Sequence, residues 1–352
     1  MKKKLLSMIM AVAMISTVVT GCGKKTATEP ATGNASIEAS VETSSEAASE
    51  ASSEEVADGA VTKDRSGNDI VVPEEVNSII SMAPSITRVL LDLGLADKIV
   101  AVDTNSGYSY GAELSADVAQ FDMMAPDQEQ IIALAADVVF TSGMSASGGD
   151  DVFAAVKEAG VCVCDIPSSA SLTDIQEDIR FIGSVVGLSE DAEKIVTTMQ
   201  EAMAELEAIA VTIPEEEKKT VLFELYTPSA DYPTIYTCGS NTYITEMVEL
   251  IGAINVAGEE AEQWPALTEE AAVAMDPQVI LTADMYTPDV INVLLTMSGW
   301  ENVTAIKDKA VYQLDSDQVN QPNQHVVSAM IAMAKAIYPD YYKDVVDPFA
   351  AN

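Results

Sequence analysis

One uninterrupted helical segment in the middle of the chain most constrains the fold. The stretch "SEDAEKIVTTMQEAMAELEAIAV" (Ser189 to Val211) contains strong helix formers, and no Gly or Pro occurs before Pro214. It therefore predicts a helix of about 20 residues. Short apolar runs alternate with helical patterns on both sides of it. This arrangement predicts an α/β fold of two lobes joined by a single long helix, with boundaries at 61–188, 189–213 and 214–352.

The first series consists of helix-then-strand units. "SIISMA" (78–83) and "KIVAVD" (98–103) are β runs on either side of a helix, a helix capped by Asp127 precedes the next strand, and "VCVCDI" ends a further unit. A later helix carries a capping box formed by Thr173 and Gln176. Such alternation with short connections predicts a parallel sheet covered by helices, a Rossmann-like lobe.

The second series repeats the pattern after the long helix. "TVLFELY" (220–226) is a predicted strand, and the helix in "NTYITEMVELIG" is capped near Asn241 and closed near Gly252. "LTEEAAVAMDPQVILTAD" predicts another helix and strand, "AVYQLD" a strand, and the last helix ends before Pro339. We therefore expect a second Rossmann-like lobe.

The N-terminus predicts export and anchoring. Three lysines precede an apolar run of about 15 residues (5–19), which is short for a membrane span of roughly 20. The run ends in "VTGC", which resembles the lipobox of bacterial lipoproteins and indicates lipidation of Cys22. Residues 1–21 are thus a predicted lipoprotein signal peptide, and 22–60 a disordered Ser/Ala/Glu-rich tether. An ordinary secretory signal with a chance cysteine is the alternative.

The charge restricts the partners. Asp and Glu number 56 against 18 Lys and Arg, a formal net charge of -38. Nucleic acid and anionic membrane surfaces are therefore excluded as partners, because their phosphates would be repelled.

Residues for catalysis or metal binding are sparse. The chain has a single histidine, His325, so a zinc cluster or a catalytic triad lacks the residues it needs. His325 is either a haem ligand or an ordinary surface or core residue. Cys162 and Cys164 point to one face of a predicted strand, either for metal or redox chemistry or as small buried hydrophobes, and Cys238 stands alone. We predict no enzyme activity, no cofactor and no metal site.

Five segments between Val76 and Pro339 together resemble a known family, the class III substrate-binding proteins of bacterial ABC importers for iron chelates and cobalamin. They occur in the family's order: "ISMAPSITRVLLDLGLADKIVAVD", "PDQEQIIALAADVVFTSG", "CGSNTYITEMVELIGAINVAG", "WPALTEEAAVAMDPQVIL" and "GWENVTAIKDKAVYQLD". The resemblance implies two lobes bridged by one stiff helix, a ligand held in the cleft between them, and delivery to a membrane permease and its ATPase.

Aromatic and Met residues in the predicted loops are the candidate ligand contacts. Flat aromatic surfaces suit a macrocycle or chelate because they offer contact area at low entropic cost. Packing within loops and core is the alternative for each of them. The candidates are Tyr108, Tyr110, Phe121, Met144, Tyr226, Trp264, Met285 and Tyr286.

The resemblance also implies a docking surface. In many members two surface Glu residues, one per lobe, contact permease arginines, and the second-lobe position corresponds to Glu246. The first-lobe position falls on Arg88, which follows a predicted Ser85 cap where a Glu or Gln is expected. Asp92 and Glu249 are close enough to share the two patches, and Arg88 and Asp92 are spaced for an i,i+4 pair.

The sequence thus predicts an extracytoplasmic solute-binding lipoprotein, anchored to the outer face of the cytoplasmic membrane, that delivers a metal chelate to an ABC importer. Anionic iron complexes are usually bound by Arg or Lys clusters, and this chain has three arginines. A corrinoid is therefore expected first, a hydroxamate-type ferric siderophore second and haem third. The alternatives are a chelatase-like extracellular enzyme on the same scaffold and a sensor or adhesion lipoprotein.

Overall fold

The computed structural model describes residues 61–146, 148–229 and 232–350. The predicted signal peptide, lipidated Cys22 and tether lie outside these residues. Among the described helices, none has the length and apolar character needed to cross a membrane.

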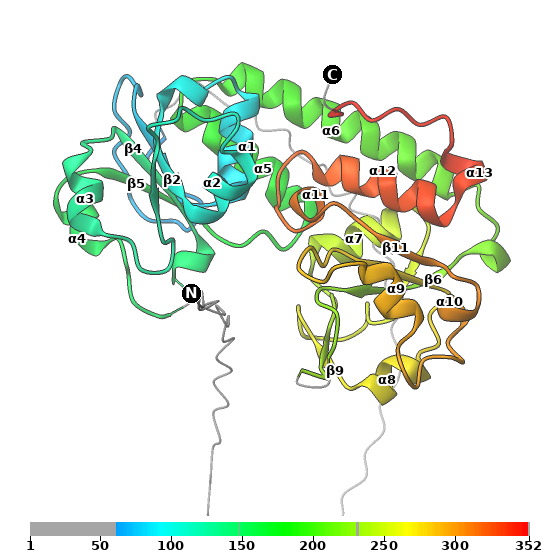
Figure 1. Cartoon of the computed structure of the whole chain (residues 1–352). Coiled ribbons are helices and arrows are strands. Elements are labelled where there is room, and N and C mark those ends of the chain that lie inside the picture. The colour runs from blue at the N-terminus through cyan, green and yellow to red at the C-terminus, as the bar shows by residue number, and fades with distance from the viewer. Residues whose placement is uncertain (1–60, 147, 230–231, 351–352) are drawn as a thin grey trace, which may run out of the picture. The chain divides into compact units, whose positions relative to one another are not determined.

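The first lobe is built on a parallel sheet (Figure 1). In the described residues this sheet has five strands in the order β3-β2-β1-β4-β5. The predicted strands at 78–83 and 98–103 are present as β1 and β2, and "VCVCDI" forms the last strand. The bounds are β1 (Ile79–Ser81), β2 (Ile99–Asp103), β3 (Ala119–Phe121), β4 (Val138–Ser142) and β5 (Cys162–Ile166).

Helices cover both faces of this sheet. Successive residues of a strand point to opposite faces. Ile79 and Phe140 lie in one buried cluster with residues of α1 and α5, whereas Ile80 and Val139 lie in another with residues of α3 and α4. Burial on both faces explains why the strands are apolar along most of their length. The helices are α1 (Pro84–Asp92), α2 (Thr104–Tyr110), α3 (Gln128–Ala133), α4 (Ala154–Glu158) and α5 (Leu172–Val185).

The second lobe has a smaller parallel sheet and a short antiparallel pair. Its described strands form the sheet β11-β10-β6-β8 and the pair β7-β9. The strands are β6 (Thr220–Glu224), β7 (Ile235–Tyr236), β8 (Ile254–Asn255), β9 (Ala266–Leu267), β10 (Val279–Thr282) and β11 (Val311–Gln313). The helices are α7 (Tyr243–Leu250), α8 (Glu269–Ala274), α9 (Val290–Leu295), α10 (Thr304–Lys307), α11 (Ser316–Val319), α12 (Val326–Ile337) and α13 (Pro339–Tyr342).

The predicted long helix is α6 (Ser189–Ala210), which runs across both lobes (Figure 1). It packs on α5 of the first lobe and on α7, α12 and α13 of the second. Gly183 permits the close approach of α5, because a Cβ there would lie 2.2 Å from the Cβ of Ala192. The fold predicted from the sequence, two α/β lobes bridged by one long helix, is confirmed.

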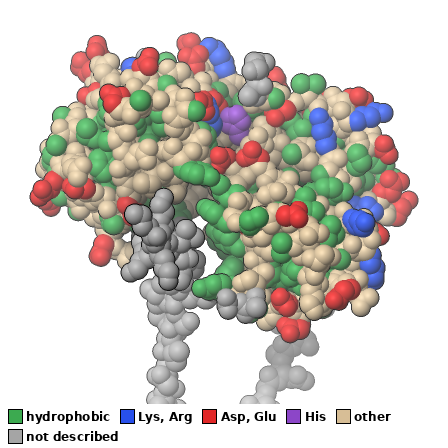
Figure 2. Space-filling view, in the orientation of Figure 1, with side chains coloured by type: hydrophobic (Ala, Val, Ile, Leu, Met, Phe, Trp, Pro, Cys, Tyr) green, Lys and Arg blue, Asp and Glu red, His purple; other side chains and the backbone are tan. Residues whose placement is uncertain are grey.

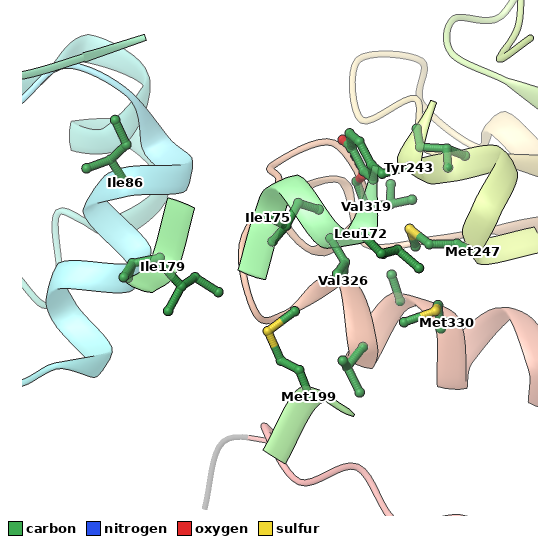
Figure 3. Close-up of a cluster of buried hydrophobic side chains, with 14 of the residues drawn as sticks. Ile86, Leu172, Ile175, Ile179, Met199, Tyr243, Met247, Val319, Val326 and Met330 are labelled. Atoms are coloured by element: carbon green, nitrogen blue, oxygen red, sulfur yellow. Dashed lines mark hydrogen bonds between the residues drawn. The ribbon is translucent and has the colours of Figure 1, made fainter. Parts of the chain in front are cut away.

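The lobes also share a hydrophobic core, which the sequence did not predict. Helix α5 contributes Ile179 toward Ile86 of α1, and Leu172 and Ile175 toward the second lobe (Figure 3). There they meet buried side chains of α7, α11 and α12: Tyr243, Met247, Val319, Val326 and Met330. The lobes are therefore held by packed surfaces as well as by α6, a contact that limits how far they can separate.

Three predicted helix starts differ from the structure. Helix α1 begins at Pro84 with Ala83 as N-cap and no side-chain cap, because Pro is preorganised for the first helical position. Helix α5 is capped by Ser171, whose capping box uses Asp174 rather than the predicted pair at Thr173. A carboxylate there also complements the helix dipole. Helix α7 is capped by Thr242, one residue after the predicted Asn241.

Candidate functional site

The carboxyl ends of the strands define where a ligand is expected. In the first sheet the chain proceeds from β1 to β2 on one side and later places β4 on the other, so the order reverses between β1 and β4. In the second sheet it reverses between β6 and β10. Open α/β sheets bind ligands outside the carboxyl ends at such points. The segments that follow these strands are therefore the candidate site.

The first lobe places the predicted ligand contacts in two different environments. Tyr108, in α2 after β2, is 79% exposed, and Met144, directly after β4, is 37% exposed. Tyr110 and Phe121 are buried, the first with its hydroxyl bonded to Gln321 of the second lobe and the second within the core beside α3. In this conformation Tyr108 and Met144 offer surface to a ligand, whereas Tyr110 and Phe121 do not.

The second lobe presents all its predicted contacts at the surface. Tyr226 follows β6, and Met285 and Tyr286 follow β10, so these three flank the reversal point. Trp264 precedes β9. Their side chains are between 40% and 76% exposed. Hydrophobic side chains gather on the side of the second lobe that borders the hollow between the lobes (Figure 2). Exposed apolar groups gathered in this way are typical of binding surfaces.

Two further exposed residues belong to the same segments. Met124 follows β3 and is 37% exposed, and Tyr232, between β6 and β7, is 65% exposed. Their position after a strand is the sequence signal that could have identified both as ligand contacts. The residue predicted from the segment "FDMMAP" is instead Phe121. In that segment the exposed apolar residue is Met124, while Phe121 is in the core.

The segments after the strands carry acids and no cations. In the sequence between each strand and the next regular element, Lys and Arg are absent after β1 to β6, β8, β10 and β11. Each arginine is ion-paired elsewhere: Arg65 with Asp178, Arg88 with Asp92, and Arg180 with Glu193. These segments therefore lack the groups that usually bind an anionic ligand, and Lys157 of α4, which lines a pocket with Thr141 and Ser145, is paired with Asp151.

Asp284, after β10, organises the loop that carries Tyr286. Its carboxylate accepts hydrogen bonds from the backbone nitrogens of Thr227, Tyr286 and Thr287, at 2.8–3.1 Å, and from the Thr287 hydroxyl at 2.7 Å. Burial raises the pKa of Asp284, but these hydrogen bonds outweigh it and hold the pKa below its ordinary value. The loop is thus fixed around an ionised carboxylate, and the Tyr286 side chain remains free.

Arg88 lies in a hydrogen-bonded network. Its Nη1 donates to Oε1 of Glu113 at 2.8 Å, and its Nη2 pairs with Asp92 four residues on. The guanidinium carbon lies 5.2 Å from the centre of the Tyr110 ring. Only 14% of the side chain is exposed. The i,i+4 pair that the spacing predicted is confirmed, and Arg88, the fifth residue of α1, lies beyond the first turn where the dipole is felt most.

This network joins the two lobes. Asp92 Oδ2 accepts a hydrogen bond from Gln324 and lies 2.9 Å from Nε2 of His325. Ser109 donates to Asp317 at 3.0 Å. Burial raises the pKa of Asp92, but the hydrogen bond with His325 and the charge of Arg88 outweigh it and lower the pKa. The cross-lobe network, as we call it, comprises Arg88, Asp92, Ser109, Tyr110 and Glu113 with Asp317, Gln321, Gln324 and His325.

The other predicted docking residues lie on an open acidic surface. Glu246 and Glu249 are exposed on α7 and line a groove of about 410 Å³ together with Glu207 and Lys218. Glu246 Oε2 also accepts a hydrogen bond of 2.7 Å from the backbone nitrogen of Leu172, the first residue of α5. This surface has the charge and exposure to meet a basic partner.

The described cysteines pack as core residues. Cys162 and Cys164 point to the same face of β5, as predicted, with their sulfurs 3.7 Å apart, and both are buried, as is Cys238. Within the described residues no three His, Cys, Asp or Glu side chains converge in a way that would hold a metal ion.

Comparisons with known proteins agree with this architecture. The model of the periplasmic binding protein family matches residues 79–318. An uncharacterised ABC transporter substrate-binding lipoprotein of Bacillus subtilis (strain 168) is 30% identical over 80% of this chain and 86% of its own length. A cobalamin-binding protein of Halobacterium salinarum is 25% identical over 78% and 73%.

A solved structure shares the fold. The molybdate-bound binding protein of Haemophilus influenzae superposes with a TM-score of 0.68 at 21% identity, covering 82% of this chain and 94% of that one. The relatives named here are solute-binding proteins. The resemblance indicated by the five sequence segments is confirmed, and the chain belongs to the periplasmic binding protein family, among the class III substrate-binding proteins of ABC transporters.

Proposed function

We propose that this protein captures a metal chelate of low negative charge, a corrinoid in the first place, between its two lobes and delivers it to an ABC importer. A hydroxamate-type ferric siderophore is the second ligand and haem the third. The protein catalyses no reaction in this proposal. Its role is capture, a small closure that the shared core permits, and release at the permease.

One observation carries the proposal: exposed aromatic and Met side chains follow the strands at both reversal points, with no cation among them. Tyr226 and Tyr286 supply flat surfaces on one side, and Tyr108 and Met144 supply apolar surface on the other. A broad, weakly polar ligand matches such walls. The similarity to a cobalamin-binding protein supports the same choice.

Haem is placed third because of its carboxylates and because of His325. This histidine, the natural axial ligand, is bonded to Asp92 within the cross-lobe network. Binding haem iron there would require that pair to break. The same lack of cations that disfavours haem propionates disfavours molybdate, the ligand of the structurally similar Haemophilus protein.

Docking completes the proposed cycle. Glu246 and Glu249 contact basic groups of the permease from the second lobe. The first-lobe contact is either Asp92, which must then exchange a partner of the cross-lobe network, or an acid of the permease that meets Arg88. The similarity to a substrate-binding lipoprotein supports anchoring through Cys22 to the outer face of the cytoplasmic membrane. The segment 22–60 then serves as the tether.

Titration of the mature chain tests the ligand. Cyanocobalamin, cobinamide, a ferric hydroxamate, a ferric tricatecholate and haem are added in turn, with tryptophan fluorescence and the visible spectrum as readouts. We expect saturable binding of the corrinoids and weak or no binding of the tricatecholate. Tight tricatecholate binding without corrinoid binding would overturn the assignment, and saturation by none of them would overturn the proposed function.

A further inference from the structure

Three buried polar residues lie at one end of an apolar cluster of the second lobe, next to the candidate site. Leu222 of β6, Ile280 of β10 and Ile235 of β7 belong to the cluster beneath α8, α9 and α10. Residues two positions on point to the same face of a strand. Those residues are polar and at most 1% exposed: Glu224, Thr282 and Thr237. The carboxyl edge therefore holds a small cluster of buried polar side chains, which we call the polar socket, at the reversal point between β6 and β10.

The socket is tied together by strand pairing. Glu224 is the register partner of Thr282 across β6 and β10. The backbone nitrogen of Leu225 donates to the carbonyl of Tyr236 at 3.0 Å, which brings β7 alongside. Yet Oε2 of Glu224 and Oγ1 of Thr237 have no hydrogen-bond partner among the described residues. Buried polar groups are nearly always paired, so these two unpaired atoms require an explanation.

The environment keeps the Glu224 carboxyl neutral. Burial raises its pKa to about 8, and the charge of Asp284 adds to the effect. The titratable groups closest to it along these strands of the described chain are Tyr226 after β6, Tyr236 and Cys238 in and after β7, and Asp284 and Tyr286 after β10. They are carboxylic acids, phenols or a thiol, and none supplies a positive charge. At neutral pH Glu224 is therefore a carboxylic acid with one donor and one acceptor.

We propose that Glu224 is a specificity-determining residue that binds a primary carboxamide of the chelate in this socket. Its hydroxyl donates to the amide oxygen and its carbonyl accepts from the amide nitrogen, a matched pair of hydrogen bonds. The inference rests on the proposed function, since the chelate must enter between the lobes. In this proposal the exposed side chains of Tyr226 and Tyr286 turn aside as the carboxamide enters.

This role sorts the proposed ligands by their chemistry. Corrinoids carry primary carboxamides around the ring, whereas hydroxamate siderophores and haem present none. A carboxylate in place of the acid could accept but not donate, so it would lose half of the pairing. Glu224 would thus select corrinoids, and would do so only while it remains protonated.

The test compares three variants of the mature chain at pH 6.5 and pH 9, with cyanocobalamin and a ferric hydroxamate as probes. Glu224→Leu should lose about tenfold in cyanocobalamin affinity at pH 6.5, with hydroxamate affinity unchanged. The wild type should bind cyanocobalamin about tenfold more weakly at pH 9, because the acid has ionised. Glu224→Gln, which keeps a donor and an acceptor, should bind at both pH values alike. Glu205→Gln, at an exposed position of α6, is the matched control and should bind both probes as the wild type does.

A second readout does not depend on ligand. The infrared spectrum at pH 7 should contain a protonated carboxylic acid band that Glu224→Gln removes, and its absence would overturn the proposal. Equal cyanocobalamin affinity of wild type and Glu224→Leu, or a flat wild-type pH profile, would also overturn it while leaving the proposed function intact. Failure of the wild type to bind any chelate would instead overturn the proposed function. If Glu224→Leu does not fold, the pH profile of Glu224→Gln decides alone.

Discussion

The junction between the lobes and the cleft between them use side chains of the same kinds in opposite ways. At the junction Ile175, Met247 and Met330 are fully buried core residues. The Tyr243 hydroxyl there donates a hydrogen bond to the carbonyl of Val319 at 3.0 Å. At the proposed ligand cleft Tyr108 and Tyr286 expose 79% and 76% of their surface. Burial at the junction stabilises the fold, whereas exposure at the cleft leaves apolar surface available for a ligand.

The polar groups at the junction also differ from those at the proposed ligand cleft. In the cross-lobe network the charges of Arg88, Asp92 and His325 are paired with one another, although Nε of Arg88 and Oε1 of Gln324 have no hydrogen-bond partner among the described residues. The buried carboxyl group of Glu224, by contrast, has no ion-pair partner, and its Oε2 has no hydrogen-bond partner, among the described residues. The charged groups that join the lobes are thus paired with opposite charges, whereas the buried carboxyl group at the proposed ligand site is not. Variants at the junction should therefore change stability, and variants at the cleft should change binding.

Truncation at the junction should have the largest effect. Ile175→Ala removes a fully buried side chain of α5 that faces the second lobe (Figure 3). We expect the free energy of unfolding to fall by about 2–5 kcal/mol, from lost transfer energy and the cavity left behind. Urea denaturation measures it.

The matched control is Ile291→Ala on α9, where the side chain is 37% exposed. This variant should lose less than about 1 kcal/mol. Equal losses in the two variants would mean that the shared core contributes no special stability.

Reversal of charge in the cross-lobe network comes next. Arg88→Glu removes the ion pairs with Asp92 and Glu113 and places a third carboxylate beside them. We expect a loss of about 1–3 kcal/mol in unfolding free energy. Arg180→Glu is the control, since the side chains of Arg180 and Glu193 are 36% and 52% exposed and their pair is worth under about 1 kcal/mol.

Transport assays on Arg88→Glu also test docking: unchanged uptake at equal protein level would remove position 88 from the permease interface.

The sequence predicted what local pattern determines. The apolar runs of β1 and β5 and the uninterrupted α6 follow from residues that are neighbours along the chain. It did not predict the contact of Asp92 with His325, which are 233 residues apart, because only the tertiary fold brings α1 beside the second lobe. Glu224 ends a run that reads as an ordinary strand, and its burial depends on β7 and β10. Tyr110 and Tyr108 are two residues apart in one motif, yet only packing decides that one is buried and the other exposed.

Truncation at the cleft should leave stability intact. Tyr286→Ala removes a side chain that is 76% exposed, so the unfolding free energy should stay within about 0.5 kcal/mol of wild type. Corrinoid affinity should fall about tenfold, the effect of losing one aromatic wall. Val211→Ala, equally exposed at the end of α6, should bind as wild type. If Tyr286→Ala loses stability but keeps its corrinoid affinity, Tyr286 supports the fold and does not contact the ligand.

The smallest predicted effect is a loss of unfolding free energy at low pH. Asp92 has a lowered pKa in the fold, chiefly because its bonds to His325 and Arg88 outweigh burial. Its contribution to stability is therefore fully present above the pKa of an unfolded Asp, about 4, and is lost as the pH falls through the lower folded value. Between pH 6 and pH 3 the wild type should lose about 1 kcal/mol more than Asp92→Asn, as measured by denaturant titration at each pH. Because the titrating group links the lobes, the loss should be accompanied by easier separation of the lobes, visible as a larger radius in small-angle scattering below pH 4. If the free energies of unfolding of the two proteins change in parallel with pH, the charge of Asp92 does not stabilise the fold. The ion pairs of the cross-lobe network would then contribute no more than an exposed surface pair.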